Sequence, residues 1–241
     1  MASGNPAPSG TSPVGAAWAE GAGEAGETTR IGSLEARLAD ERSRRVLLVS
    51  HCLLNQNVRY LGGAFRPGMV PEALAPFICE GDGLYQMPCP EQAAWGGVSK
   101  KWILRFHGSE RRWAYRFRAV LLPLFLAWTR WRYRLLAARV ARHVADYRRS
   151  GYRVVGILGV GDSPSCGVRH TLDLARALPV VASLDVFGID RRTFDERVIR
   201  GCAVAGEGLY IGALRRALER RHLTVPLLEY RPPLSVGDAA G

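Results

Sequence analysis

Apolar residues gather along the chain in short continuous runs, and segments with helical periodicity lie between them. The runs that indicate strands are Val46–Ser50, Gly83–Pro88, Tyr152–Val160 and Val180–Phe187, with Leu223–Tyr230 as a fifth candidate. Runs that are apolar throughout, rather than alternating, are typical of strands covered on both faces. The segments that indicate helices are Pro71–Cys79, Phe117–Arg149, Gly167–Leu178 and Gly206–Arg221.

Strand and helix therefore alternate along the chain, which predicts an α/β fold. We expect a Rossmann-like, open and mostly parallel sheet with flanking helices, formed by a single domain over residues 45–241. Residues 1–28 are rich in Ala, Gly, Ser, Pro and Thr, which predicts a disordered tail. A short lead-in helix over 33–45 is expected to connect it to the domain. The tail has no Lys, Arg or apolar core segment, so a secretory signal is not expected.

The net charge of +11 is concentrated in one part of the chain. Residues 100–150 hold 14 Lys or Arg and only two acidic residues, Glu110 and Asp146. We interpret this basic helical segment as a long amphipathic helix on the sheet with a solvated basic face. A nucleotide or RNA contact and a membrane-surface helix are the alternatives. The apolar stretch 119–128 is too short for a bilayer, which needs about 20 residues, so no transmembrane segment is expected.

Three of the five cysteines follow predicted strands. Cys52 and Cys89 come directly after the first two strands, and Cys166 lies in the turn after the third. Because the carboxyl ends of parallel strands border the ligand crevice, the three thiols could meet there as a soft metal site. Buried structural cysteines are the alternative. Cys79 and Cys202 are expected to be ordinary packing cysteines.

The number of candidate ligands bears on the kind of metal. A structural zinc would need a fourth ligand, such as His51 or His170. On a [4Fe-4S] cluster, three thiolates leave one iron open, and an open iron is a Lewis acid that can bind a substrate sulfur or oxygen. Three cysteines therefore favour a catalytic cluster over an electron-transfer cluster. Sparse cysteines in an odd number do not suit a disulfide scaffold, so a cytoplasmic location is expected.

Four motifs in this order resemble those of the thiouracil desulfurase family. They are VSHCLLNQNVRYLGG at Val49–Gly63, CPE at Cys89–Glu91, SPSCG at Ser163–Gly167, and GEGLYIGALRRAL at Gly206–Leu218. The resemblance spans about residues 46–220. It implies an oxygen-sensitive [4Fe-4S] cluster held by Cys52, Cys89 and Cys166. It also implies a non-redox reaction that converts C=S to C=O in a thiouracil-like base or nucleoside, with oxygen from water and release of sulfide.

Two residues next to the implied ligands are candidates for catalysis. Glu91 is expected to act as the base that deprotonates the attacking water, and Ser165 to orient the substrate or the water. The alternatives are a carboxylate that stabilises a helix N-terminus and a serine that only closes a turn.

Three residues of the first motif are expected to contact substrate. Arg59 is suited to a substrate oxygen or anion, with a structural ion pair as the alternative, and Tyr60 and Asn55 accompany it. Asn55 stands where many family members have Gly, and Asp162 where a basic residue is common. These departures indicate a divergent branch, in which the basic segment 100–150 could help to hold a nucleoside, a nucleotide or tRNA.

A second class of function is a metal-stabilised nucleic-acid-binding module without catalysis. It would use tryptophans that lie among arginines, namely Trp102, Trp113, Trp128 and Trp131. These tryptophans follow an apolar helical pattern, so we expect them in the core. A redox or cluster-carrier protein is a third class, and the lack of a fourth thiolate argues against it.

Overall fold

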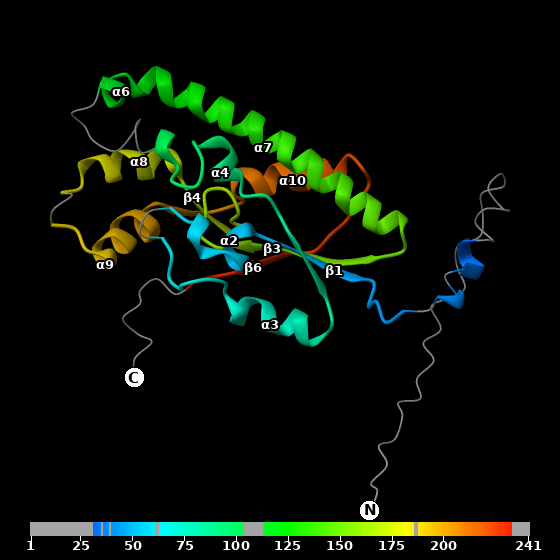
Figure 1. The fold of residues 1–241 in the computed structure, drawn as a ribbon. Coiled ribbons are helices and arrows are strands. Elements are labelled where there is room, and N and C mark those ends of the chain that lie inside the picture. Colours follow the sequence, from blue (N-terminus) through cyan, green and yellow to red (C-terminus); the bar gives the residue numbers. More distant parts are fainter. Residues whose placement is uncertain are drawn as a thin grey trace, which may run out of the picture. The chain divides into compact units, whose positions relative to one another are not determined.

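The structure is a computed structural model, and it describes residues 31–34, 36–38, 40–60, 63–103, 113–185 and 188–232. The chain divides into two units, Met1–Arg42 and Ser43–Gly241. In the first unit, residues 31–34 and 36–37 are helical, and the tail expected over 1–28 lies outside the described residues. The second unit carries the sheet and its helices (Figure 1).

A four-stranded parallel sheet forms the centre of the second unit. Its strands are β1 Arg45–Val49, β2 Gly83–Gln86, β3 Arg153–Val160 and β6 Leu227–Tyr230, in the order β2-β1-β3-β6. All of their pairings are parallel, which confirms the predicted α/β class with a mostly parallel sheet. The strand order reverses between β1 and β3, and such a switch point creates a crevice beyond the carboxyl ends of the two strands.

Helices of very different length connect the strands. They are α2 His51–Leu54, the 3-10 helix η1 Gln56–Val58, α3 Pro71–Cys79, α4 Pro90–Ala94, α6 Trp113–Arg116, α7 Arg118–Arg149, α8 Leu174–Ser183, α9 Arg191–Phe194, the π-helix η2 Asp195–Arg200, and α10 Leu209–Glu219. The helix predicted over 71–79 has the observed bounds, and the one over 117–149 differs from α7 by one residue. Periodicity locates these two helices well because apolar residues recur at helical spacing along each segment.

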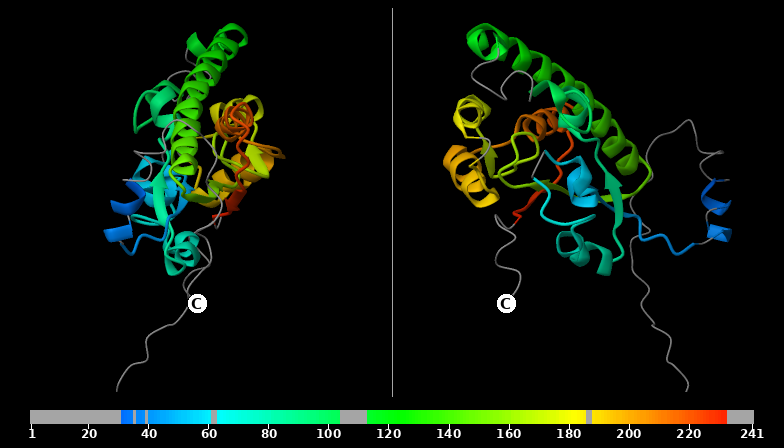
Figure 2. Two further views of the ribbon diagram at one scale, coloured as in Figure 1. Left: turned by 90° about the vertical axis from the view of Figure 1, so that its right-hand side faces the viewer. Right: turned by 60° about the vertical axis from the view of Figure 1, so that its left-hand side comes forward.

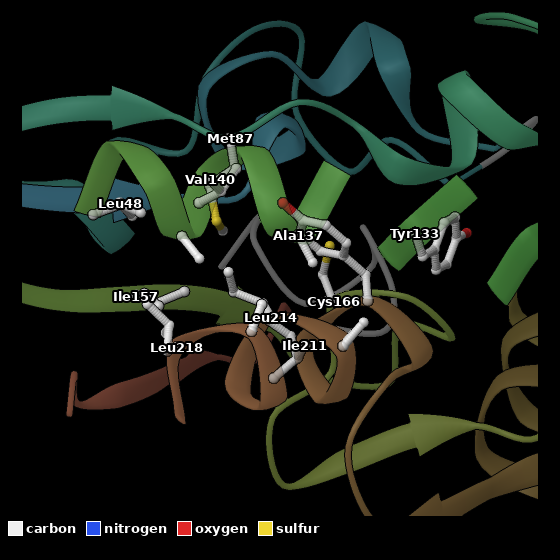
Figure 3. Packing of buried hydrophobic residues seen from close by; sticks show 14 of the residues in the cluster. Leu48, Met87, Tyr133, Ala137, Val140, Ile157, Cys166, Ile211, Leu214 and Leu218 are labelled. Atoms are coloured by element: carbon white, nitrogen blue, oxygen red, sulfur yellow. The ribbon is translucent and has the colours of Figure 1, made fainter. Parts of the chain in front are cut away.

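Both faces of the sheet are covered because successive strand residues point to opposite sides. Val46 and Leu48 of β1 belong to the core beneath α7 and α10, whereas Leu47 and Val49 belong to the core with α3. Figure 1 shows α3 on the face opposite to α7 and α10, and Figure 2 shows α7 and α10 side by side. Figure 3 shows the core between the sheet and these two helices, with Cys166 among its members.

The predicted strand Val180–Phe187 is wrong, because residues 180–183 belong to α8. Asp173 caps this helix, since its side chain accepts a hydrogen bond from the backbone N–H of Ala175 at 2.9 Å. A short apolar run does not distinguish a buried strand from a buried helix turn by its periodicity. Residues 186 and 187 lie outside the described part of the chain.

The predicted helix Gly167–Leu178 is correct only in its second half. Its first half holds β4, His170–Leu172, which pairs antiparallel with β5, Ala203–Ala205, in a separate two-stranded sheet. The two strands are distant in sequence and only three residues long, so local periodicity does not reveal them.

Candidate functional site

A cavity of about 440 Å³ lies at the carboxyl edge of the sheet, and the three cysteines predicted as metal ligands all line it. Cys52 lies in α2 directly after β1, Cys89 precedes α4 after β2, and Cys166 lies in the turn after β3. Residues far apart in sequence meet here because parallel strands end at the same edge. The described cysteines are all free thiols.

The turn that carries Cys166 is held from two sides. Within the turn, Ser163 Oγ accepts hydrogen bonds from the backbone N–H groups of Ser165 at 3.3 Å and Cys166 at 3.0 Å. From outside, the backbone N–H of Tyr210 at the start of α10 donates to Ser165 O at 3.0 Å. A Cβ on Gly208 would lie 2.5 Å from the carbonyl carbon of Ser165, so only glycine allows this approach. The glycine-rich fourth motif thus supports the position of Cys166.

Cys89 has a second structural task as the N-cap of α4. Its Sγ accepts a hydrogen bond from the backbone N–H of Gln92 at 3.5 Å, and Pro90 occupies the first turn of the helix. Proline suits this position because its missing N–H would have no partner in the helix. The short helix thereby fixes both the thiol and the neighbouring Glu91.

Burial raises the pKa of all three thiols. Burial raises the pKa of Cys166 well above its ordinary value, and the charges of Cys52 and Cys89 add to this effect. Burial, followed by the charge of Glu91, raises the pKa of Cys89 to about 11. Burial also raises the pKa of Cys52, although Arg59 opposes it. A bound cation would reverse this electrostatic effect, and three cysteines free of disulfides fit an iron–sulfur cluster.

Two histidines, His51 and His170, were candidates for a fourth metal ligand. His51 lines the cavity, whereas His170 is outside the lining residues and its Nδ1 lies 3.7 Å from Glu229 Oε1. Among the described residues, no three His, Cys, Asp or Glu side chains are placed to hold one metal ion. In a [4Fe-4S] cluster the ligands bind different iron atoms rather than a single ion.

A buried chain of polar side chains leads to the cavity. Glu91 Oε2 lies 2.5 Å from Lys100 Nζ, and Glu91 Oε1 accepts a hydrogen bond from Ser165 Oγ at 3.1 Å. Tyr133 OH lies 2.7 Å from Ser165 Oγ. Because the single hydroxyl proton of Ser165 goes to Glu91, Tyr133 must donate to Ser165. The order of donation is therefore Tyr133 to Ser165 to Glu91, with Lys100 on the other carboxylate oxygen.

Lys100 is a site residue that the sequence reasoning missed. Lys100 is only 3% exposed. Its backbone has φ +51°, a left-handed conformation that costs a non-glycine residue about 1–3 kcal/mol. Burial alone would lower the pKa of Lys100, but the charge and hydrogen bond of Glu91 raise it, so the ammonium stays protonated at neutral pH. Gly96 and Gly97, both with positive φ, mark the tight loop before it and were the available signal.

Tyr133 was also missed, and the sequence contains no specific signal for it. It occupies one of the regularly spaced buried positions of α7, where apolar residues are the rule. Its hydroxyl finds Ser165 only because α7 packs across the turn after β3. Burial, and then the charge of Glu91, raise the pKa of Tyr133 well above its ordinary value, so this phenol remains a donor.

The remaining predicted site residues have different positions. Arg59 and Tyr60 line the cavity, and Arg59 Nε is buried without a hydrogen-bond partner among the described residues. Asn55 is not one of the lining residues, because its side chain turns back to accept a hydrogen bond from Asn57 N at 3.1 Å and caps η1. Ser165 is fully buried behind the wall, so its geometry suits positioning of Glu91 rather than direct contact with substrate.

Several residues outside the cavity depart from expectation. Cys202 is buried as expected, but Cys79 is exposed, because it ends α3 on its solvent side. The four tryptophans expected in the core are exposed instead, with exposed fractions of 44%, 67%, 39% and 49% in the order Trp102, Trp113, Trp128, Trp131. The apolar pattern of α7 has two faces, and only the face with Tyr133 packs on the core. None of the described helices, α7 included, is long and apolar enough to cross a membrane.

Comparison of the chain with protein-family models, with curated proteins and with solved structures found no match.

Proposed function

We propose that this protein is a [4Fe-4S]-dependent, non-redox desulfurase that removes sulfur from a thiocarbonyl small molecule. One observation carries the proposal: three free thiols from three strand ends line one cavity together with an ion-paired carboxylate. The four motifs that resemble the thiouracil desulfurase family point to the same chemistry. A reducing cytoplasm would suit an oxygen-sensitive cluster and free thiols.

Cys52, Cys89 and Cys166 would hold the cluster. When bound, the cluster would supply a Lewis-acidic iron that polarises a C=S bond and takes up the sulfur. The protein fixes the positions of the thiols. Cys52 lies in α2, Cys89 caps α4, and Cys166 lies in a turn held by hydrogen bonds. Arg59 Nε, which has no partner, could donate a hydrogen bond to an oxygen or nitrogen of the substrate.

Glu91 is the proposed general base. Lys100 pairs with Oε2 of its carboxylate, and Ser165 fixes the carboxylate plane through Oε1. Each carboxylate oxygen has a second lone pair, so Glu91 can accept a proton from water as the water oxygen bonds to the thiocarbonyl carbon. The C–S bond then breaks and the carbonyl forms as the hydroxyl proton is lost. Both protons of the water, including the one taken up by Glu91, leave with the sulfur as hydrogen sulfide. No external electron donor is needed.

Anaerobic reconstitution with iron and sulfide tests the proposal. We expect about four irons per chain, a visible cluster spectrum, and release of sulfide from 2-thiouracil. Cys52→Ala, Cys89→Ala and Cys166→Ala should each abolish cluster assembly, whereas Cys202→Ala is the matched control for a buried cysteine elsewhere. Full iron and sulfide in Cys166→Ala would refute the ligand assignment.

A second set of measurements tests the base. Glu91→Gln should retain iron and sulfide but lose activity by at least about 100-fold, the usual effect of removing a general base. Thermal unfolding of the variant checks that the fold survives. Wild-type turnover in a folded Glu91→Gln protein would remove Glu91 from this role.

The exposed face of α7 supports a second candidate, a nucleic-acid-binding module. The rings of Trp128 and Trp131 lie 5.1 Å apart, and the Arg132 guanidinium lies over both at 5.6 and 5.9 Å. Exposed aromatic rings among arginines are typical of surfaces on which bases stack. Salt-dependent binding of single-stranded RNA without desulfuration, lost in Trp131→Ala, would favour this candidate. Turnover of 2-thiouracil without RNA binding would exclude it.

A further inference from the structure

The lining of the cavity includes two chemically different sets of residues. One set is the three cysteines with Glu91 and Lys100. The other set, here called the apolar lobe, is formed by side chains of α8 and η2. Its main residues are Leu174, Ala177, Leu178, Val181, Val198 and Ile199. Of these two helices, α8 also contains residues 180–183 of the run predicted as a strand.

The charged groups near the apolar lobe are already paired. Arg191 Nε donates a hydrogen bond to Asp195 Oδ2 at 2.8 Å, and Asp195 is only 3% exposed. The Arg191 guanidinium therefore already has a charge partner in Asp195. Among the described residues that line the cavity, Arg59 alone keeps a buried side-chain polar atom without a partner. The cavity thus offers a ligand one unpaired buried donor and an extended apolar wall.

We infer that the substrate joins a small thiocarbonyl head to an apolar body that fills the apolar lobe. This inference rests on the proposed function for the head and on the lobe for the body. Phosphate or sugar hydroxyl groups in the lobe would lose their hydrogen bonds to water without replacement, which disfavours nucleotides and tRNA as occupants. Alkyl or aryl groups would gain the hydrophobic contribution of burial.

Arg59 sets the orientation of such a substrate. Its guanidinium carbon lies 5.6 Å from the centre of the Tyr60 ring and 5.4 Å from that of Phe65, so two aromatic rings hold it in place. Because Arg59 lines the same cavity as the cysteines and the lobe, its Nε can donate to an acceptor atom beside the thiocarbonyl group. The head is then directed to the cysteines and the body to the lobe.

Isothermal titration calorimetry of the full chain, without added iron and after reconstitution, tests this inference. The probes are 2-thiouracil, 6-propyl-2-thiouracil and 2-thiouridine 5′-monophosphate. Burying one methylene favours binding roughly fourfold, so the propyl compound should bind at least about tenfold more tightly than 2-thiouracil. The nucleotide should bind more weakly than both.

Two neighbouring residues of α8 provide a matched pair of variants. Val181 lines the cavity and Val180 does not, and both are half-buried valines of one helix. Val181→Asn should remove the advantage of the propyl group over 2-thiouracil, whereas Val180→Asn should retain the advantage. Leu184→Asn, at another half-buried lining position, replaces Val181→Asn if thermal unfolding shows that the latter does not fold.

The outcomes separate this inference from the proposed function. Equal binding of 2-thiouracil and 6-propyl-2-thiouracil, or tighter binding of the nucleotide, would refute the inference that the substrate has an apolar body. This holds even if 2-thiouracil is turned over. A propyl advantage that depends on Val181 supports the lobe because binding is measured without turnover. If that advantage comes without any cluster or sulfide release, the lobe stands as a binding site and the desulfurase proposal fails.

Discussion

The ion pair between Glu91 and Lys100 is the residue-scale feature on which the proposed chemistry depends. Both side chains are almost fully buried, and each is the other's charge partner. Burial of two charges is unfavourable unless the geometry and the further hydrogen bonds are good. Ser165 and Tyr133 supply those further bonds. The left-handed backbone of Lys100 shows that the fold accepts strain to deliver this ammonium to Glu91.

Lys100→Met is expected to lower the free energy of unfolding by about 3 kcal/mol, because it leaves a buried carboxylate without its partner. Chemical denaturation measures this change. Lys101→Met is the control, since Lys101 is exposed and the substitution should change stability by less than about 0.5 kcal/mol. A Glu91→Gln/Lys100→Met double variant should recover part of the loss. Equal effects at Lys100 and Lys101 would contradict the buried pair.

Tyr133→Phe is expected to reduce the free energy of unfolding by about 1 kcal/mol, because Ser165 loses the donor that satisfies its oxygen. The ring of Tyr210 packs edge-on against that of Tyr133, and its buried hydroxyl has no partner among the described residues. Tyr210→Phe is therefore the matched control and should not destabilise the protein. Thermal unfolding of both variants makes the comparison. A larger loss in Tyr210→Phe would overturn the assigned order of donation.

At the scale of elements, the turn after β3 depends on β6 as well as on α10. Glu229 of β6 accepts backbone N–H hydrogen bonds from Val168 at 2.9 Å and Arg169 at 2.7 Å, directly after the cysteine turn. Burial alone would raise the pKa of Glu229, but these bonds and those from His170 lower it below its ordinary value. One carboxylate thus links the last strand to the segment that carries Cys166.

Glu229→Gln should cost about 1–2 kcal/mol at neutral pH, because hydrogen bonds to a charged acceptor are stronger than those to an amide. The lowered pKa in the folded state means that this stabilisation is present above the pKa of the unfolded chain. It is lost as pH falls through the folded-state value. Unfolding free energies measured across the acidic range should therefore show a smaller decrease with falling pH in the variant. An identical acid dependence in both proteins would refute this role of Glu229.

At the scale of the whole molecule, the strand order creates the site. The reversal between β1 and β3 opens the carboxyl edge of the sheet, and the exits of β1, β2 and β3 each deliver one thiol to it. The helices α8, α9 and η2 add further parts of the wall. The result is one cavity in which Cys166 is buried and Cys52 and Cys89 are half-buried, while Cys79 remains exposed on α3.

Thiol labelling of cluster-free protein should reflect this difference in burial. Cys79 is expected to react first with iodoacetamide at pH 8, as followed by mass spectrometry. Cys89, with its pKa raised to about 11, should hold roughly a thousandth of its thiol as thiolate at that pH. Its rate should rise with pH up to about 11. Labelling of the cavity thiols as fast as Cys79 would contradict their burial.

The amino-acid sequence by itself determined the class of fold and the candidate ligands. Apolar runs located the four strands of the main sheet, most clearly β1 and β3, whose burial on both faces leaves a local pattern. Cysteines placed just after strands could be assigned to one edge, because parallel strands end together.

Only the tertiary structure decided the rest. It turned the run at 180–187 into a helix over residues 180–183, joined Tyr133, Ser165, Glu91 and Lys100 into one chain of contacts, and removed Asn55 from the site. It also exposed the tryptophans of α7, whose two apolar faces look alike in sequence. The physical reason is common to all of them. The structure formed by an apolar run, and the contacts made by a polar residue, depend on groups that pack against them from distant parts of the chain. Local periodicity contains no information about those groups.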